Sequence, residues 1–323
     1  MTIPRGWNAG DMPSLAGQVA VVTGGNAGLG YFTALELAVH GAQVILACRN
    51  TGKAAVAAAR IGEQAPGAVI RVARCDLASL ESVRSFAAGL PAGEPVDLLV
   101  NNAGVMAIPR ARTEDGLEMQ IGTNHFGHFA LTALLLPRLL AAPAPRVVTL
   151  SSFMHQFGTI DFDDLNRERR YTRWGAYCQA KLANLLFTLE LDRRARSAGA
   201  PLTSVACHPG YAATGLQTAG ARSAPARALV AAANGAFAVT AREGAQPTLC
   251  AAAFPRLPGG SYIGPGGPGG YRGSPGYNAP SRKAVNPVVA ARLWAVSEQV
   301  TGIPFAFPKG PGATGAAAAA GEG

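Results

Sequence analysis

Apolar residues between residue 17 and about residue 210 fall into short runs that alternate with longer amphipathic segments. The runs have the length and composition of buried β-strands. They lie at residues 18–25, 43–49, 69–77, 95–104, 146–152 and 202–210. Strands that alternate with helices predict right-handed βαβ crossovers and a parallel sheet covered on both faces. The pattern therefore predicts a three-layer, doubly wound α/β fold in a single domain.

Two of the predicted helices have recognisable ends. The helix that begins near residue 28 meets Gly41, which suits a left-handed C-terminal cap. The helix near residue 80 has Ser79 as its N-cap and Glu81 in its first turn, where a carboxylate interacts favourably with the helix dipole.

The pattern is weaker after residue 210. Residues 223–254 predict two helices, residues 255–284 are rich in Gly and Pro and predict no regular structure, and residues 286–302 predict another helix. We expect residues 1–16 to form an N-terminal extension, residues 17–305 to form one domain, and residues 306–323 to be a disordered tail.

Composition indicates a globular protein. The chain has 323 residues, 49% of them hydrophobic, which suffices for the core of a full domain. It lacks an apolar run of about eighteen residues and an apolar stretch behind a basic N-terminus. We therefore expect a cytoplasmic protein without an integral membrane segment.

Charge and cysteine content argue against a nucleic-acid-binding site and against a disulfide framework. The formal charge is +9, but the basic residues are dispersed and not interleaved with aromatic residues, so we expect no nucleic-acid partner. The cysteines are odd in number and scattered, which indicates buried thiols in a reducing compartment. They are Cys48, Cys75, Cys178, Cys207 and Cys250.

A glycine-rich turn follows the first predicted strand. The stretch TGGNAGLG places Gly24, Gly28 and Gly30 between that strand and a helix. Free amides and the dipole at a helix N-terminus attract anions, so this arrangement predicts a pyrophosphate cradle. A glycine-rich turn without a ligand is the alternative. At the end of the second strand, where an acidic residue would indicate NAD, the sequence has Arg49, followed by Lys53, which favours a 2′-phosphate and hence NADP(H).

The chain resembles the short-chain dehydrogenase/reductase family. The motifs TGGNAGLG, CDL, NNAG, TNHFGHF, LSS, YCQAK and HPG occur in the family's order between residue 17 and about residue 215. The stretches ACRN, NHFGHF and YCQAKLANLLF are similar to the group of retinol dehydrogenases, WW-domain oxidoreductases and protochlorophyllide reductases. The resemblance implies a Rossmann-like domain, an alcohol/carbonyl oxidoreductase reaction and a homo-oligomer.

The resemblance also implies a set of cofactor contacts, with NADP(H) favoured over NAD(H). The implied residues are Gly24, Asn26, Ala27, Gly28, Leu29, Gly30, Arg49, Asn50, Lys53, Asp76, Leu77, Asn102, Ala103, Gly104, Tyr177, Lys181, Pro209, Gly210 and Thr214.

By the same resemblance, the catalytic residues are Asn124, Ser152, Tyr177 and Lys181. Tyr177 is implied as the general acid/base, with Lys181 as its activator. Their i, i+4 spacing agrees, since it places an ammonium beside a phenol on one helix face and so predicts a phenol pKa below its ordinary value of about 10. A Tyr/Lys pair on a solvated helix face is the alternative.

Ser151 and Ser152 both follow a strand, and successive residues of a strand point in opposite directions. Ser152 matches the family position that polarises the substrate oxygen, and we expect Ser151 to point away. His125 and His128 lie at i and i+3, but neither cysteine nor carboxylate accompanies them at ligand spacing, so we expect packing histidines and no metal site.

We expect the substrate pocket to lie within residues 153–175 and 211–280. Ser152, Tyr177 and Tyr211 are the expected substrate contacts, and nearby apolar residues indicate a hydrophobic small molecule. Two alternatives stay open at this point. One is an NADPH-dependent reductase of a carbon–carbon double bond, and the other is a catalytically silent protein that senses NADP(H).

Overall fold

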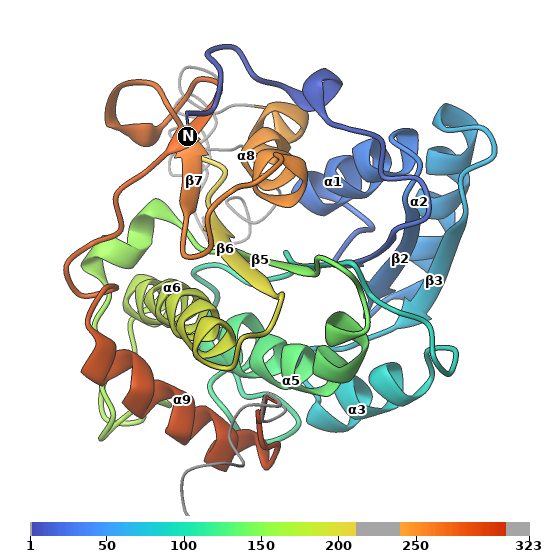
Figure 1. Ribbon diagram of the computed structural model, residues 1–323. Coiled ribbons are helices and arrows are strands. Elements are labelled where there is room, and N and C mark those ends of the chain that lie inside the picture. Colours follow the sequence, from blue (N-terminus) through green and yellow to red (C-terminus); the bar gives the residue numbers. More distant parts are fainter. Residues whose placement is uncertain (1, 211–239, 308–323) are drawn as a thin grey trace, which may run out of the picture.

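The computed structural model of the chain describes residues 2–210 and 240–307. Its centre is one sheet with the strand order β3-β2-β1-β4-β5-β6-β7-β8, parallel except for the antiparallel pair of β7 and β8 (Figure 1). The strands are β1 (Val19–Thr23), β2 (Gln43–Cys48), β3 (Ile70–Arg74), β4 (Leu98–Asn101), β5 (Arg146–Leu150), β6 (Thr203–Cys207), β7 (Tyr262–Pro265) and β8 (Pro275–Tyr277). The predicted doubly wound α/β fold is confirmed.

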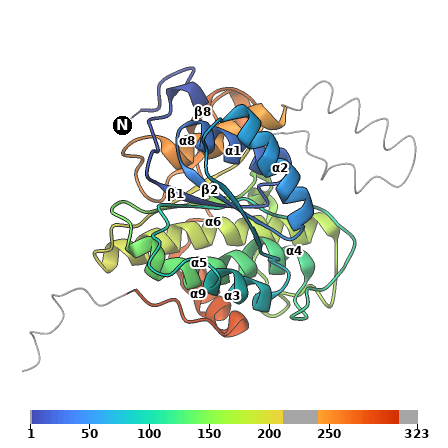
Figure 2. The same ribbon diagram turned by 90° about the vertical axis from the view of Figure 1, so that its right-hand side faces the viewer.

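Helices cover both faces of the sheet (Figures 1 and 2). One layer contains α1 (Gly28–Val39), α2 (Thr51–Gln64) and α8 (Ala241–Ala253). The other contains α3 (Leu80–Ala88), α5 (Gly127–Leu140) and α6 (Arg173–Ser197). The short elements are η1 (Ala9–Asp11), α4 (Met119–Ile121), the π-helical turn η2 (Gly122–Phe126), η3 (Phe153–Phe157) and η5 (Pro268–Gly270).

The two-residue period of the strands explains why the core has two halves. In β1, Ala20 and Val22 join the hydrophobic cluster under α1 and α8, whereas Val19 and Val21 join the cluster under α3 and α5. All four side chains are buried. A strand covered on both faces must be apolar at every position, which is why these strands appear in the sequence as continuous apolar runs.

The last helix, α9 (Pro287–Thr301), packs outside α6 and contacts α5 (Figure 1). Its Trp294 is 2% exposed and lies in an aromatic cluster with Phe129, Phe187 and Phe305, at ring-centroid distances of 5.2, 5.8 and 4.6 Å. Burial of one such ring contributes about 2–3 kcal/mol. The helix predicted over 286–302 is therefore confirmed, and it completes the layer that carries α6.

The prediction that residues 255–284 lack regular structure is wrong, because this stretch contains β7 and β8. Tyr262 pairs with Ala206 of β6, and Ile263 pairs with Cys207. Gly264 is a glycine because of close packing, since a Cβ at this position would overlap the imidazole of His208. The glycine at position 264 therefore reflects close packing within a strand, whereas the Gly- and Pro-rich sequence predicted no regular structure.

The predicted helix ends are confirmed. Gly41 has φ +94°, and the Ser79 side chain accepts a hydrogen bond from Ser82 N at 3.4 Å. Of the two helices predicted over 223–254, α8 is present, and the first falls outside the described residues.

Both ends of the described chain pack against the domain. Trp7, Met12 and Leu15 are buried in the same cluster as α1 and α8, so residues 7–15 contribute to the core. Phe307, which the sequence assigned to the tail, stacks on Phe305 at 6.0 Å, and residues 308–323 fall outside the described part. Within residues 2–210 and 240–307, no helix combines the length and apolar character needed to cross a bilayer.

Candidate active site

The glycine turn after β1 brings the backbone close to the end of β4. Gly24 has φ +65°, and a Cβ there would lie 3.0 Å from the Ala103 Cβ. A Cβ on Gly30 would lie 2.5 Å from the Gly24 carbonyl oxygen and closer still to Asn102 Nδ2. A larger residue at either position would push the turn away from β4, so both glycines are required by close approach.

The N-terminus of α1 fits an anionic ligand. Its N-cap is Ala27, which provides no side-chain hydrogen bond to the first turn. Gly28 has φ +55°, and a Cβ there would meet nothing within 4 Å, so open space lies beside the start of the helix. Asn26 and Leu29 are partly exposed beside it. Unsatisfied amides that face open space are the features that a pyrophosphate group requires.

Arg49, Asn50 and Lys53 lie together where β2 meets α2. Asn50 caps α2, since its Oδ1 accepts from Lys53 N at 2.9 Å. Arg49 and Lys53 are exposed, and neither side chain has a hydrogen bond or ion pair with any of the described residues. Two cations at this edge provide the charge that a 2′-phosphate needs.

The other predicted cofactor residues lie at the carboxyl ends of neighbouring strands. Asp76 accepts from Ala78 N at 3.0 Å, and Leu77 is buried beneath α5. Asn102 Nδ2 donates to Thr23 O at 2.7 Å. Pro209 and Gly210 follow β6, and Gly210 has φ +72°. Thr214 and Tyr211 lie outside the described residues.

Tyr177 and Ser152 meet where α6 passes the end of β5. Tyr177 is 8% exposed, and the Ser152 side chain lies beside its hydroxyl, where it favours the ionised phenol. Ser152 Oγ also accepts from Met154 N at 3.2 Å. Ser151 is turned away, since its hydroxyl donates to the Lys181 carbonyl at 2.7 Å. The structure thus brings the predicted Ser152–Tyr177 pair together.

Burial dominates the ionisation of Tyr177. It raises the pKa of the phenol to about 12, against the smaller lowering effect of the Ser152 hydrogen bond. The Lys181 ammonium lies 5.8 Å from the centroid of the phenol ring. The prediction of a pKa below the ordinary value is therefore wrong, because loss of hydration is the largest effect on this phenol.

Lys181 lies on the buried side of α6. Its Nζ donates to the Leu150 carbonyl at 2.9 Å, and Asn184 Nδ2 donates to the same oxygen at 2.9 Å. Burial lowers the pKa of the Lys181 ammonium to about 8. Near neutral pH this ammonium can release a proton, which an exposed lysine does not do.

Asn124 lies in the π-helical turn η2 and is fully buried. Its side chain is bonded to one residue, accepting from Val105 N at 2.8 Å and donating to Val105 O at 2.9 Å. A Cβ on Gly104 would lie 3.0 Å from Asn124 Oδ1 and 3.7 Å from Lys181 Nζ, so these groups converge at Gly104. Single π-helical turns are frequent at functional sites.

The two histidines of TNHFGHF are buried packing residues, as predicted. His125 bonds Ser297 Oγ at 2.9 Å, and His128 bonds Thr23 Oγ1 at 2.9 Å. Burial lowers the pKa of His125 to about 3 and that of His128 to about 4, so both are neutral. In the part of the chain that the structure describes, no group of three or more metal-ligating side chains gathers. All five cysteines are buried free thiols.

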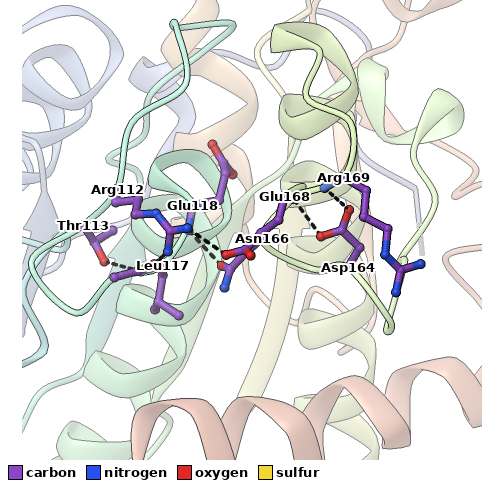
Figure 3. Close-up of polar contacts among 9 residues, drawn as sticks. Arg112, Thr113, Leu117, Glu118, Asp164, Asn166, Glu168 and Arg169 are labelled. Atoms are coloured by element: carbon purple, nitrogen blue, oxygen red, sulfur yellow. Dashed lines mark hydrogen bonds and ion pairs between the residues drawn. The ribbon is translucent and has the colours of Figure 1, made fainter.

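The insert between Ser152 and Tyr177 folds back against the segment before α4 (Figure 3). Arg112 forms an ion pair with Glu168 at 2.8 Å, and Asn166 Oδ1 accepts from Glu118 N at 2.9 Å. Asp164 fastens the insert internally by accepting from the backbone of Glu168 at 2.7 Å. These bonds hold the loop that leads into α6.

Two residues that the sequence reasoning missed connect the site. Thr23 Oγ1 accepts from Asn102 N at 2.9 Å and from Ala103 N at 3.0 Å, which joins the glycine turn to the end of β4. Gln120 is fully buried and accepts from Ala107 N at 2.9 Å while donating to the Arg173 carbonyl at 2.9 Å. Thr23 could have been found as a hydroxyl directly before the turn, but Gln120 has no such local signal.

A family model described as short chain dehydrogenase matches residues 18–224. Human retinol dehydrogenase 12 is 42% identical over 290 residues, which cover 90% of this chain and 88% of that protein. Human retinol dehydrogenase 13 is 50% identical over 205 residues, 63% of this chain and 61% of that protein, so this match spans less than two thirds of the relative.

Two solved structures are similar as well. An uncharacterised protein of Mycobacterium paratuberculosis has a TM-score of 0.79 and 47% identity, covering 94% of this chain and 100% of that one. A protein of Beutenbergia cavernae, described as an NAD(P)-dependent gluconate 5-dehydrogenase with NADP bound at low occupancy, has a TM-score of 0.58 and 29% identity. The match covers 74% of this chain and 91% of that one.

Proposed function

Because the chain belongs to the short-chain dehydrogenase family and is an oxidoreductase that acts on CH–OH groups, we propose that it transfers a hydride between NADP(H) and an alcohol/carbonyl pair. Ser152, Tyr177 and Lys181 are the proposed catalytic side chains. The observation that supports this most directly is the buried Tyr177 phenol, which lies beside the Ser152 side chain and one helical turn from Lys181. A surface Tyr/Lys pair would show neither the burial nor the serine contact.

The cofactor residues fit a dinucleotide. The turn from Gly24 to Gly30 and the uncapped start of α1 would hold the pyrophosphate, and Arg49 with Lys53 would hold a 2′-phosphate. Lys181 would hydrogen-bond the nicotinamide ribose. When bound, NADPH supplies the hydride.

The ionisation of Tyr177 favours carbonyl reduction. A phenol with a pKa raised to about 12 keeps its proton at neutral pH, so it is a donor to a substrate oxygen. The Ser152 hydroxyl would hold the same oxygen. As that oxygen gains negative charge, it takes the Tyr177 proton. Lys181, whose pKa is lowered to about 8, then restores the proton to the phenolate, with Asn124 at the next position of the relay.

We propose a hydrophobic carbonyl compound as the substrate class. The curated relatives are named retinol dehydrogenases, after an apolar alcohol. Two aromatic side chains near Ser152 and Tyr177 are exposed. Trp174 is 52% exposed, and its ring centroid lies 6.0 Å from that of Tyr177. Phe157 is 66% exposed and ends η3, the short helix that Ser152 caps. Exposed aromatic rings beside a buried polar pair suit a ligand with an apolar body and a polar end.

The test is NADPH consumption by the purified protein and by Tyr177→Phe with a panel of aldehydes and ketones, run in parallel with NADH. We expect Tyr177→Phe to lose about 10²–10⁴-fold in kcat while it keeps its Kd for NADPH. A variant that retains a near-wild-type rate contradicts the proton-transfer role. Product analysis detects reduction of a carbon–carbon double bond, and tight NADPH binding without turnover identifies a silent sensor.

A further inference from the structure

His155 lies three residues after the catalytic serine and is 1% exposed. It belongs to η3, the short helix that Ser152 caps. Its Nδ1 lies 2.7 Å from the Ser152 carbonyl oxygen, and its Nε2 lies 3.1 Å from the backbone nitrogen of Ser281. Both ring nitrogens of a buried histidine therefore have backbone partners.

These two partners determine the tautomer. The Ser281 backbone N–H is a donor, so Nε2 must accept and carries no proton. The Ser152 carbonyl is an acceptor, so Nδ1 carries the proton and donates it. Burial lowers the pKa of His155, against the opposing effect of the Ser152 carbonyl, and so favours this neutral ring.

The ring also links the serine to the C-terminal segment. Beyond Ser281, the Lys283 ammonium donates to the Gly158 carbonyl at 2.8 Å, so residues 281–283 are fastened to η3 at two points. The Tyr262 ring packs against the His155 ring, with an angle of 89° between the ring planes and 5.4 Å between the centroids. This packing fixes the plane of the imidazole. His155 thus holds the Ser152 backbone from a rigid support.

We propose that His155 is a positioning residue for Ser152, in which the Nδ1–H tautomer, anchored by Ser281 N, holds the serine carbonyl so that the Ser152 hydroxyl faces Tyr177 and the substrate oxygen. This inference rests on the proposed function. The effect acts through orientation, and a displacement of about 1 Å in a reacting geometry costs on the order of 10²-fold in rate.

Two substitutions separate the two ring nitrogens. His155→Asn keeps an N–H donor near the Nδ1 position and loses the acceptor for Ser281 N. His155→Gln reaches the Nε2 position with an oxygen acceptor and loses the side-chain donor to the Ser152 carbonyl, which keeps its bond from the backbone N–H of residue 155. Ser281→Ala is the matched control, because only the backbone of Ser281 takes part in the bond. Each protein is measured for kcat, for KM of NADPH and of the carbonyl substrate, and for its urea midpoint.

We expect His155→Gln to lose at least about tenfold in kcat with the KM for NADPH changed less than about twofold. His155→Asn should stay within about threefold of wild type, although its urea midpoint falls at least as far as that of His155→Gln. Equal losses of kcat in both variants, or a loss that follows the urea midpoint, overturn the positioning role.

A measurement on the unaltered protein supports or overturns the same inference if His155→Gln does not fold. In ¹⁵N-histidine NMR spectra we expect His155 to show a neutral ring protonated at Nδ1, and a ring protonated at Nε2 overturns the inference. A wild-type protein that turns over none of the carbonyl panel overturns the proposed function, and this inference with it. An active wild type with a near-wild-type His155→Gln overturns the inference alone.

Discussion

The buried ammonium of Lys181 predicts a protein that gains stability when this lysine is lost. Lys181 is 5% exposed, and burial lowers its pKa from 10.5 to about 8. At about 1.4 kcal/mol per pKa unit, the charged form destabilises the folded state by about 3 kcal/mol below pH 8. Lys181→Met removes this cost and loses one hydrogen bond to Leu150, worth about 1 kcal/mol. We expect the variant to be about 2 kcal/mol more stable at pH 7 and catalytically inactive.

The pH dependence gives the sharper test. A lysine whose folded-state pKa is lowered binds fewer protons in the folded than in the unfolded state between pH 8 and 10.5. Over this window its contribution to wild-type stability therefore rises with pH by about 1.4 kcal/mol per unit. The advantage of Lys181→Met should decline from pH 8 to 10 in urea unfolding. Lys283→Met is the control, since that ammonium also donates to a carbonyl but is exposed. A Lys181→Met variant that is less stable than wild type at pH 7, by an amount that does not change up to pH 10, refutes the reasoning.

Four further outcomes are expected. Arg49→Ser should lower kcat/KM with NADPH by about 10–100-fold and with NADH by less than about threefold, because a charge-assisted hydrogen bond contributes about 1.5–3 kcal/mol. Equal losses with the two cofactors contradict a 2′-phosphate site at Arg49. Gly30→Ala should destabilise the protein by about 2 kcal/mol or more in urea unfolding because its Cβ would meet Asn102 and the Gly24 carbonyl. Gly62→Ala, with nothing within 4 Å of its Cβ in α2, should stabilise it by about 0.5–1 kcal/mol. Burial lowers the pKa of His125 to about 3, so its contribution to the stability of the folded protein is fully present above pH 6.5 and falls by about 1.4 kcal/mol per pH unit as the pH drops towards 3. Near pH 5, unfolding of His125→Gln should therefore take up about one proton fewer than unfolding of the wild type.

The fold was predictable from the sequence, and so was the proximity of several candidate site residues, because both depend on short-range patterns. Strands β1, β2 and β4 are apolar over most of their four to six residues, although β3 at the edge of the sheet contains Arg71 and Arg74. The pair Tyr177 and Lys181 lies within one helical turn, and Gly24, Gly28 and Gly30 lie within one loop, so their relation is fixed locally. Ser152 lies beside them because it follows a parallel strand, and the carboxyl ends of parallel strands lie at one edge of the sheet.

What could not be predicted depends on contacts between distant segments. The raised pKa of Tyr177 comes from burial, which α6 acquires only by packing against the sheet and α9. Strand β7 was missed because Gly264 and Pro265 are typical of loops, while the constraint that selects the glycine is the imidazole of His208. The bridge from His155 to Ser281 spans more than a hundred residues and leaves no periodic signal.

The position of α9 has a consequence for how the chain folds during synthesis. The glycine turn, α1 and the strands up to β4 precede residue 102, so the ribosome releases the cofactor half of the sheet early. The aromatic cluster behind α6 needs Trp294 and Phe305, which are made last. Until then Phe129 and Phe187 lack their ring contacts with Trp294 and Phe305, and apolar surface left uncovered during folding promotes aggregation and chaperone binding. We expect nascent chains that stop before residue 287 to bind NADP(H) weakly and to be retained by chaperones, because the layer that supports Tyr177 is still incomplete.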